Sequence, residues 1–443
     1  MIWKAKAGPF ISPVPDDLDS VTEIDRAGEC DPEELGLERE AVPAIWSAIQ
    51  DFYRTGLQPG ISVAIRRHGK LVLHRAIGYA RGNGPEDGLD VPKLPMRTST
   101  PVCLFSASKA ITAMLMHKLV EDGRVGLHDR VADHVPEYGV RGKEKTTILN
   151  LLTHRAGIPS IPIKDPDPAL LQEWDTIVQM LCAAKPLHTV GWIQAYHAIT
   201  AGFVLGEVIQ RATGRSLREV ITETFRKPLG FRYFNYGLEA QDQPEAAFNY
   251  FTGSPIMFPL SYVARRVLGV DFERVATLAN DHHYMSAVVP AGNLYATADE
   301  ASRFFQMLLN GGELDGTRIF NERTLQRAVR PTGIIQFDRS LMIPMRFSAG
   351  MMLGEWPAGL YGQNCPQAFG HLGFINIVCW ADPARDISAA LLTTGKSMAI
   401  ENLTAFGKLL FAFSQHCTTV PNVQRKSWSQ NLGVRSALAA REA

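Results

Sequence analysis

Apolar residues near the start of the chain recur with two different periods. Residues 38–53 carry apolar residues at helical spacing, which predicts an amphipathic helix. Residues 61–65 and 71–77 then alternate between apolar and polar, the pattern of two half-buried strands. His68-Gly69-Lys70 lies between them, so the two strands are predicted to form a β-hairpin.

The middle of the chain, residues 146–285, is mainly helical in pattern, with loops that contain proline. Residues 148–152 and 198–212 predict two helices, and Ser216 is placed to cap a third. Residues 298–309 predict a further helix, which Asn310-Gly311-Gly312 ends.

The last third of the chain returns to strand patterns. Residues 374–380 and 387–394 are short runs rich in β-forming residues, and Asp382-Pro383 between them predicts a hairpin connection. Residues 401–413 predict a closing helix. After Cys417 the periodicity is lost, so residues 418–443 are predicted to be a C-terminal tail.

This order of elements predicts an α+β or α/β fold. Strands from both ends of the chain have to meet in one antiparallel sheet with helices on its faces. We therefore expect one α/β domain from residues 1–145 and 286–443, and a mainly helical domain from residues 146–285. A cleft between two such lobes is a usual place for a small-molecule site.

Composition excludes several classes of function. The 443 residues have 45 basic and 45 acidic side chains, which gives no net charge and no basic surface for a nucleic acid. No apolar run is long enough to cross a membrane. The first residues are too rich in proline for a signal-peptide core, so a cytoplasmic location is expected. The oligomeric state stays open.

Ser106-Ala107-Ser108-Lys109 is the segment with the clearest chemistry. It precedes apolar residues at helical spacing, so Lys109 should lie one helical turn from Ser106, on the same face. A lysine in that place can take the serine proton, and Ser-Lys pairs are a known form of nucleophile and base. A serine that caps a helix beside a solvated lysine is the alternative, and the tetrapeptide alone does not exclude it.

Three further segments bear on this choice. They are the run from Ile148 to Gly157, which contains Thr153-His154-Arg155, then Tyr196-His197-Ala198, and Gly370-His371-Leu372-Gly373-Phe374. Together with Ser-x-x-Lys, these segments resemble the class C β-lactamase superfamily, and most of all its family VIII carboxylesterases. The resemblance covers about residues 38–415 and implies a β-lactamase-like fold.

The resemblance also implies a role for each motif. Ser106 is expected to attack an acyl carbon and become acylated, with Lys109 and Tyr196 as general base and acid. Which of the two is the formal base stays open, because their titrations are expected to be coupled. The oxyanion hole is expected to use the backbone N–H groups of Ser106 and Phe374. No cofactor and no metal are expected.

Two departures from the family pattern concern the substrate. The lactamase members have Lys-Thr-Gly where this chain has His371-Leu372-Gly373, and an asparagine where it has Ala198. Both changes weaken recognition of an anionic lactam, so a small neutral ester is the expected substrate. His371 is only partly charged near neutral pH and is expected to polarise Tyr196 through a hydrogen bond. A β-lactamase or D-alanyl peptidase, an acyltransferase and an inactive binding protein remain as alternatives.

Several residues near the motifs are expected to line an apolar substrate pocket: Phe105, Trp192, His197, Trp356, Tyr361, Gly373 and Phe374. Gly373 is expected because the backbone must approach the substrate closely there.

Other motifs are weaker. Cys103 is a rival nucleophile without a neighbouring histidine. Asp281-His282-His283 resembles a metal site, but a surface role is expected. Thr394-Gly395-Lys396-Ser397 resembles the end of a phosphate loop without its first glycine, so we interpret it as the end of a strand. No Gly-x-Ser-x-Gly motif is present, which argues against an α/β-hydrolase.

Overall fold

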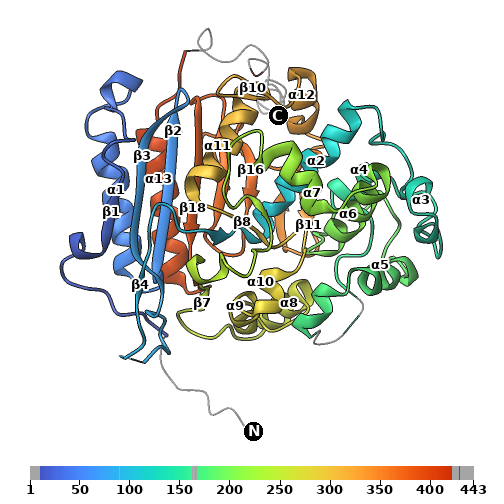
Figure 1. The fold of residues 1–443 in the computed structure, drawn as a ribbon, viewed down its shortest axis with the longest axis horizontal. Helices are drawn as coiled ribbons and strands as arrows, with labels where there is room; N and C mark the ends of the chain where they lie inside the picture. The colour runs from blue at the N-terminus through green and yellow to red at the C-terminus, as the bar shows by residue number, and fades with distance from the viewer. Residues whose placement is uncertain (1–9, 89, 162, 164–166, 422–428, 430–443) are drawn as a thin grey trace.

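The computed structural model describes residues 10–88, 90–161, 163, 167–421 and 429. An eight-stranded antiparallel sheet lies at one side of the molecule, in the order β1-β3-β2-β18-β17-β16-β13, and β4 pairs with β3 (Figure 1). Its strands are β1 (Thr22–Ile24), β2 (Gly60–Arg67), β3 (Lys70–Arg81), β4 (Leu94–Pro95), β13 (Met352–Leu353), β16 (Phe369–Leu372), β17 (Val378–Asp382) and β18 (Ile387–Thr393).

The two ends of the chain meet in this sheet. Strand β2 pairs with β18 over its length, from Ile61 opposite Thr393 to Arg67 opposite Ile387. The β2–β3 hairpin turns at His68 and Gly69, whose φ angles of 52° and 83° are both in the left-handed region that a tight hairpin turn needs. The predicted hairpin and the predicted meeting of distant strands are both confirmed.

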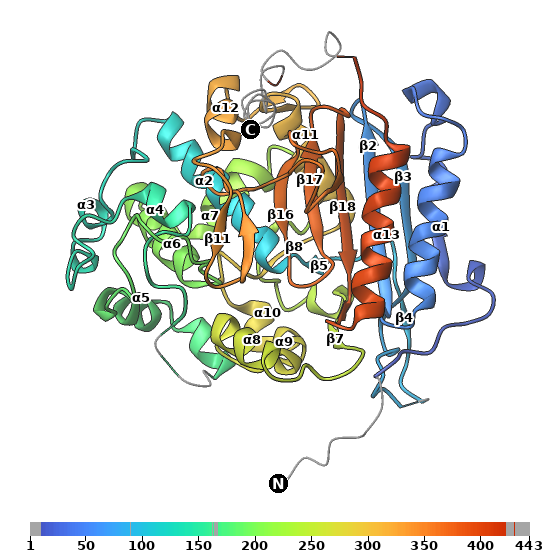
Figure 2. The same cartoon turned by 180° about the vertical axis from the view of Figure 1, so that it is seen from behind.

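Helices cover both faces of the sheet (Figures 1 and 2). Helices α1 and α13 pack together on one face, and α11 lies on the other. The thirteen α-helices of the described residues are α1 (Ala41–Arg54), α2 (Ser108–Glu121), α3 (Val131–His134), α4 (Ile148–Leu152), α5 (Trp174–Ala183), α6 (Thr200–Thr213), α7 (Leu217–Ile221), α8 (Leu260–Leu268), α9 (Phe272–Ala279), α10 (His282–Ser286), α11 (Ala298–Leu309), α12 (Glu322–Val329) and α13 (Ile400–His416).

Short strands connect the sheet region with the helical region. Strand β8 lies between β5 and β6 in a three-stranded sheet, and β11 and β12 form an outlying hairpin. The short strands are β5 (Val102–Cys103), β6 (Asn235–Tyr236), β7 (Tyr250–Phe251), β8 (Leu294–Ala296), β9 (Glu313–Leu314), β10 (Thr317–Arg318), β11 (Gln336–Asp338), β12 (Ile343–Met345), β14 (Ala358–Gly359), β15 (Gly362–Gln363) and β19 (Gly395–Lys396).

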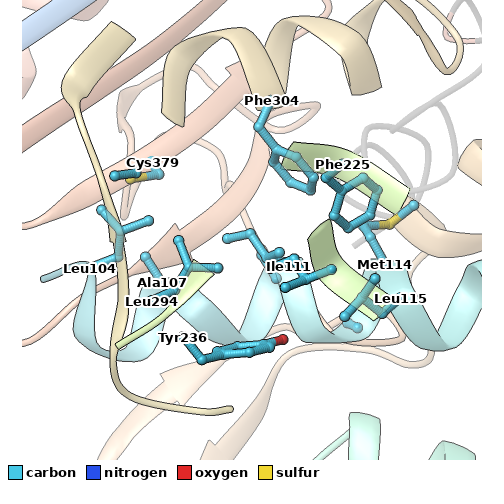
Figure 3. Close-up of a cluster of buried hydrophobic side chains, with 14 of the residues drawn as sticks. Leu104, Ala107, Ile111, Met114, Leu115, Phe225, Tyr236, Leu294, Phe304 and Cys379 are labelled. Atoms are coloured by element: carbon cyan, nitrogen blue, oxygen red, sulfur yellow. The ribbon is translucent and has the colours of Figure 1, made fainter. Parts of the chain in front are cut away.

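Helix α2 is the central helix of the larger core cluster. The sequence predicted one buried stripe on it, but nearly every side chain from Ser108 to Leu119 is buried. Figure 3 shows why: Phe304 of α11, Phe225 and Tyr236 surround the helix from different elements. A helix packed on all sides has little freedom to move, so the residues at its start are held firmly.

The structure corrects two boundaries. Of the strand predicted over 374–380, only the part that belongs to β17 forms. A turn precedes β17, and the hydrogen bond from Gly373 N–H to Ile377 O, at 2.8 Å, closes this turn. Ile375 and Asn376 have left-handed φ angles, which no strand accommodates. In the predicted tail, Val420 N–H donates to Ala384 O, and the residues after 421, Ser429 apart, lie outside the described residues.

Among the residues that the structure describes, no helix combines the length and the apolar character needed to cross a bilayer. The cytoplasmic location and the division into two domains stay predictions.

Gly395 makes the fold sensitive to a single methyl group. A Cβ there would lie 1.8 Å from the backbone oxygen of Leu57, so Gly395→Ala must push two backbones apart. We expect it to lower the free energy of unfolding by about 1–3 kcal/mol. Gly407 in α13 is the matched control: a Cβ there meets nothing within 4 Å, so Gly407→Ala should stabilise by about 0.5–1 kcal/mol. Urea unfolding of both variants checks the contrast, and equal effects would contradict it.

Candidate active site

Ser106 lies in a short 3₁₀ turn, Phe105–Ala107, directly before α2. Strand β5 delivers the chain to this turn, and Leu104 N–H donates to Leu294 O at 2.8 Å beyond the strand pairing. Phe105 has φ +45°, a left-handed conformation that is uncommon for a residue with a side chain. Such strain persists only where the surroundings hold it, and it is frequent beside nucleophiles.

The amine of Lys109 is buried and contacts three oxygens. Its Nζ lies 3.0 Å from Ser106 Oγ, 2.6 Å from Ala198 O and 2.9 Å from Ala291 O. Carbonyl oxygens only accept hydrogen bonds, so two N–H groups of Lys109 must point at Ala198 and Ala291. The remaining position on the tetrahedral nitrogen faces the serine hydroxyl.

The protonation of Lys109 decides what fills this last position. Burial holds the pKa of Lys109 well below its ordinary value of 10.5. A neutral amine has two N–H groups and one lone pair, which match two carbonyls and one hydroxyl proton. The geometry therefore suits removal of the Ser106 proton by Lys109.

Tyr196 lies in a segment without helix or strand, and other elements hold its backbone. Ala195 N–H donates to His154 O (3.0 Å), Tyr196 N–H to Asp338 Oδ1 (3.0 Å), and His197 N–H to His154 Nδ1 (3.2 Å). The Tyr196 ring lies 4.8 Å from Lys109 Nζ. Ser106, Lys109 and Tyr196 thus lie together, and their catalytic roles stay predictions.

Burial is the main cause that raises the pKa of the Tyr196 phenol above its ordinary value. Hydrogen bonding with the Ser106 side chain opposes this rise, and the charge of Asp338 adds to it. A phenol that is hard to ionise is suited to carry a proton rather than to stand as a phenolate.

The turn after β16 lies against the Ser106 turn because residue 373 is glycine. A Cβ at Gly373 would lie 2.6 Å from Leu104 O and 2.7 Å from the Ile377 side chain. In this structure the close approach at Gly373 is to the protein's own backbone, and its approach to a substrate stays a prediction. The rings of Phe105 and Phe374 pack at 5.6 Å between centroids. Within the described residues, the N–H groups of Ser106 and Phe374 donate to no acceptor, as an oxyanion hole requires.

His371 differs from its expected role. Its Nδ1 lies 2.6 Å from Leu372 O, so Nδ1 carries the proton and donates, and no hydrogen bond joins it to Tyr196 within the described residues. The two rings lie 6.2 Å apart. Burial lowers the pKa of His371 to about 3, so the ring is neutral at physiological pH rather than partly charged. The expected polarisation of Tyr196 is wrong for this structure.

His197 is a structural histidine. Its Nδ1 lies 2.7 Å from Ala195 O, and its Nε2 accepts from Ile158 N–H at 3.2 Å. Both nitrogens are thus occupied by backbone groups, and burial lowers the pKa of His197 to about 3. The prediction that His197 lines the substrate pocket is wrong.

A cavity of about 140 Å³ opens beside Ser106. Most of its side chains are apolar, and they include residues of α8, α9 and α10 and of the turns that carry Phe105 and Phe374. Its lining residues are Phe105, Ser106, Ile161, Asp167, Leu171, Ala198, Ile199, Leu268, Val270, Val275, Leu278, Ala279, Tyr284, Val289, Ala291, Gly292 and Phe374. Two of the residues predicted for the pocket, Phe105 and Phe374, are among them.

The three remaining aromatic candidates do not line this cavity. Tyr361 packs on Trp380 with ring centroids 6.2 Å apart and donates to Met352 O, so it belongs to the core beneath α13. Trp192 and Trp356 are 80% and 64% exposed. These predictions fail because an aromatic residue near a motif in sequence carries no information about the face on which it emerges.

The structure also shows the surroundings of the rival motifs. Burial raises the pKa of Cys103 to about 11, so its thiolate is scarce. Asp281 caps α10 by accepting His283 N–H at 2.8 Å, and the three possible metal-binding atoms lie within 4.8 Å on a partly exposed turn. Gly395 and Lys396 form strand β19, as expected from the sequence.

Two residues with a part in the site were not singled out from the sequence. Asp338 accepts a hydrogen bond from the backbone N–H of Tyr196, which is 142 positions away in the sequence. No short-range pattern indicates such a contact. His154 was noted within a motif without a role. Its φ of +59° and its two hydrogen bonds to the Tyr196 segment identify it as the support of that segment.

Comparison with known proteins agrees with this geometry. The β-lactamase family model matches residues 48–407, so the chain belongs to the β-lactamase family, a family of serine hydrolases. It is 26% identical to the esterase/β-lactamase LipL of Mycobacterium tuberculosis over 316 residues, 68% of this chain and 70% of that protein.

Two solved structures are similar over most of their length. A family VIII carboxylesterase has a TM-score of 0.72 and 25% identity, over 88% of this chain and 99% of that one. A penicillin-binding protein homologue from Caulobacter crescentus has a TM-score of 0.71 and 26% identity, over 84% and 96%. The fold and family expected from the sequence are confirmed.

Lys109→Arg tests whether the lysine is a base or only a cation. Arginine keeps the charge and the donors but does not deprotonate. We expect a loss of at least about a hundredfold in kcat/KM towards an ester. In the wild type, kcat/KM should rise with pH through the lowered pKa of Lys109 and level off below 10.5. An active arginine variant, or a rise only at the ordinary lysine pKa, would contradict the role.

Gly373→Ala tests the position of the Phe374 N–H. The new Cβ must displace Leu104 O or the turn, so we expect kcat to fall about tenfold to a hundredfold with little change in KM. Steady-state kinetics with a thermal unfolding control measures this. An unchanged kcat would show that the turn is not part of the oxyanion hole.

Proposed function

We propose that this protein is a serine carboxylesterase that acts on small neutral esters. The observation that supports it most is the buried Lys109 amine, 3.0 Å from Ser106 Oγ with both carbonyl partners satisfied. That geometry supports a nucleophile with a base at hand, beside an apolar cavity.

The proposed reaction has two halves. Lys109 takes the proton of Ser106 as Oγ attacks the ester carbonyl carbon. The oxyanion that forms accepts hydrogen bonds from the backbone N–H groups of Ser106 and Phe374. The proton passes through the Lys109–Tyr196 pair to the leaving alcohol, and the C–O bond breaks to leave an acyl-enzyme on Ser106. Water then attacks the acyl carbon as Lys109 takes its proton, the bond from the acyl carbon to Ser106 Oγ breaks, and Oγ regains that proton as the acid is released.

The charge of the site favours a neutral substrate over an anionic lactam. Among the described residues that line the cavity no side chain is cationic, and Asp167 contributes a carboxylate. His371, in the place of the family's lysine, is kept neutral by burial. A substrate carboxylate would therefore lose its water here without gaining a partner.

A β-lactamase activity is the second candidate, because the relative LipL is named for both activities. A D-alanyl peptidase and an acyltransferase use the same acyl-enzyme and differ only in the group that donates or accepts the acyl chain. An inactive binding protein would form no acyl-enzyme.

A substrate panel on the wild type and Ser106→Ala separates these candidates. We expect turnover of p-nitrophenyl esters with short to medium acyl chains, lost by at least about a thousandfold in Ser106→Ala, and slow or no turnover of a chromogenic cephalosporin. A fluorophosphonate probe should label the wild type and Cys103→Ser equally and leave Ser106→Ala unlabelled. Fast cephalosporin turnover without ester turnover would overturn the esterase, and no labelling at Ser106 would support a binding protein.

A further inference from the structure

Asp338 is a fully buried acidic residue that the mechanism above does not use. It ends strand β11, and its Oδ1 accepts three backbone N–H groups: those of Tyr196 (3.0 Å), Ser340 (2.9 Å) and Leu341 (3.0 Å). Three donors on one oxygen form an environment that a carboxylate anion favours. Its Oδ2 is buried and has no hydrogen-bond partner among the described residues. Burial of an acidic group is unfavourable enough that it calls for a reason.

The contact of Asp338 with Tyr196 is one half of a clamp. On one side, His154 accepts two hydrogen bonds, from Ala195 N–H to its backbone oxygen and from His197 N–H to its Nδ1. On the other side, residues at the turn of the β11–β12 hairpin hold the same segment: Tyr196 N–H donates to Asp338, and Arg339 N–H donates to Gln194 O at 3.0 Å. The segment has no regular structure of its own, so these contacts determine where the phenol lies.

Asp338 also supplies charge to a site that otherwise has little. The groups facing Tyr196 are Lys109 of α2, His154 after α4, His371 of β16 and Asp338 of β11. Burial lowers the pKa of both histidines and of the lysine, which favours their neutral forms. Asp338 is the one acidic residue among these four groups, and after burial its charge adds to the raised pKa of the phenol.

We propose that Asp338 is a positioning residue for Tyr196: opposite His154, its buried carboxylate holds the tyrosine backbone and places a negative charge beside that segment, so that Lys109 is the base and Tyr196 gives its proton to the leaving group. This assignment rests on the proposed function for the direction of proton transfer. The effect of Asp338 on the phenol itself does not depend on it.

The first experiment reads the phenol without any substrate. A difluorotyrosine installed at position 196 has a more acidic phenol, which brings its titration into the range where the protein is folded, and ¹⁹F NMR follows it. Asp338→Asn keeps an amide oxygen for the three N–H groups and removes the charge. We expect the midpoint of the titration to fall by about 1 pH unit.

Glu300→Gln is the matched control. Glu300 of α11 is also buried and accepts backbone N–H groups, those of Arg232, Tyr233 and Thr297, but it does not contact Tyr196. In Glu300→Gln we expect the midpoint of the difluorotyrosine titration at position 196 to equal that of the wild type. A midpoint unchanged in Asp338→Asn, or shifted equally in Glu300→Gln, would overturn the proposal.

The second experiment separates the anchor from the charge. Asp338→Ala loses the acceptor as well, so we expect kcat to fall about a hundredfold, since small displacements of a reacting group have effects of that size. Asp338→Asn keeps the acceptor and loses the charge, so its kcat should fall less than that of Asp338→Ala while its pH profile shifts. Equal kinetics for Asp338→Ala and the wild type would refute the anchor. If the wild type turns over no ester, the proposed function fails while the NMR titration still tests Asp338.

Discussion

The site depends on one buried amine that joins three parts of the chain. Lys109 Nζ contacts Ser106 at the start of α2, Ala198 in the segment of Tyr196, and Ala291 before β8. A buried ammonium without such partners would be too unfavourable to keep, and the two carbonyls can accept from a protonated or a neutral amine. The desolvation that surrounds the contact favours the neutral amine, and this is the form that can accept a proton.

The rest of the fold serves to hold these three parts at fixed distances. Helix α2 is enclosed on all sides, so the serine and the lysine at its start cannot move apart. Glycines bring the other parts close: a Cβ at Gly202 of α6 would lie 2.7 Å from Ala291 N, and one at Gly373 would lie 2.6 Å from Leu104 O. Both contacts are with backbone atoms, which cannot adjust as a flexible side chain can.

The sequence predicted the elements and the contact of Lys109 with Ser106 better than it predicted the surroundings of that contact. Ser106, Lys109 and the β2–β3 hairpin follow from local spacing, because helical and strand periods determine which neighbours share a face. Asp338 and Tyr196 are 142 positions apart, and Tyr196 lies in a segment without helix or strand. No hydrophobic period in the sequence therefore indicates their contact. Tyr361, predicted for the pocket, lies in the core under α13, because the same aromatic side chain suits a core or a pocket equally well.

Burial explains why so few groups near the serine are able to titrate. His154, His197 and His371 all lie close to the Tyr196 segment, and each has its pKa lowered because its charged form would be poorly solvated. Histidines that bind a proton so weakly do not compete with the Lys109 amine for the serine proton. An imidazolium among them would also repel the ammonium that forms when Lys109 takes that proton. In the proposed reaction, excluding water from the histidines thus leaves proton transfer to one amine and one phenol. Since burial lowers the pKa of the amine and raises that of the phenol, the amine is ready to accept a proton while the phenol holds one to give, which is the division of roles that acylation requires.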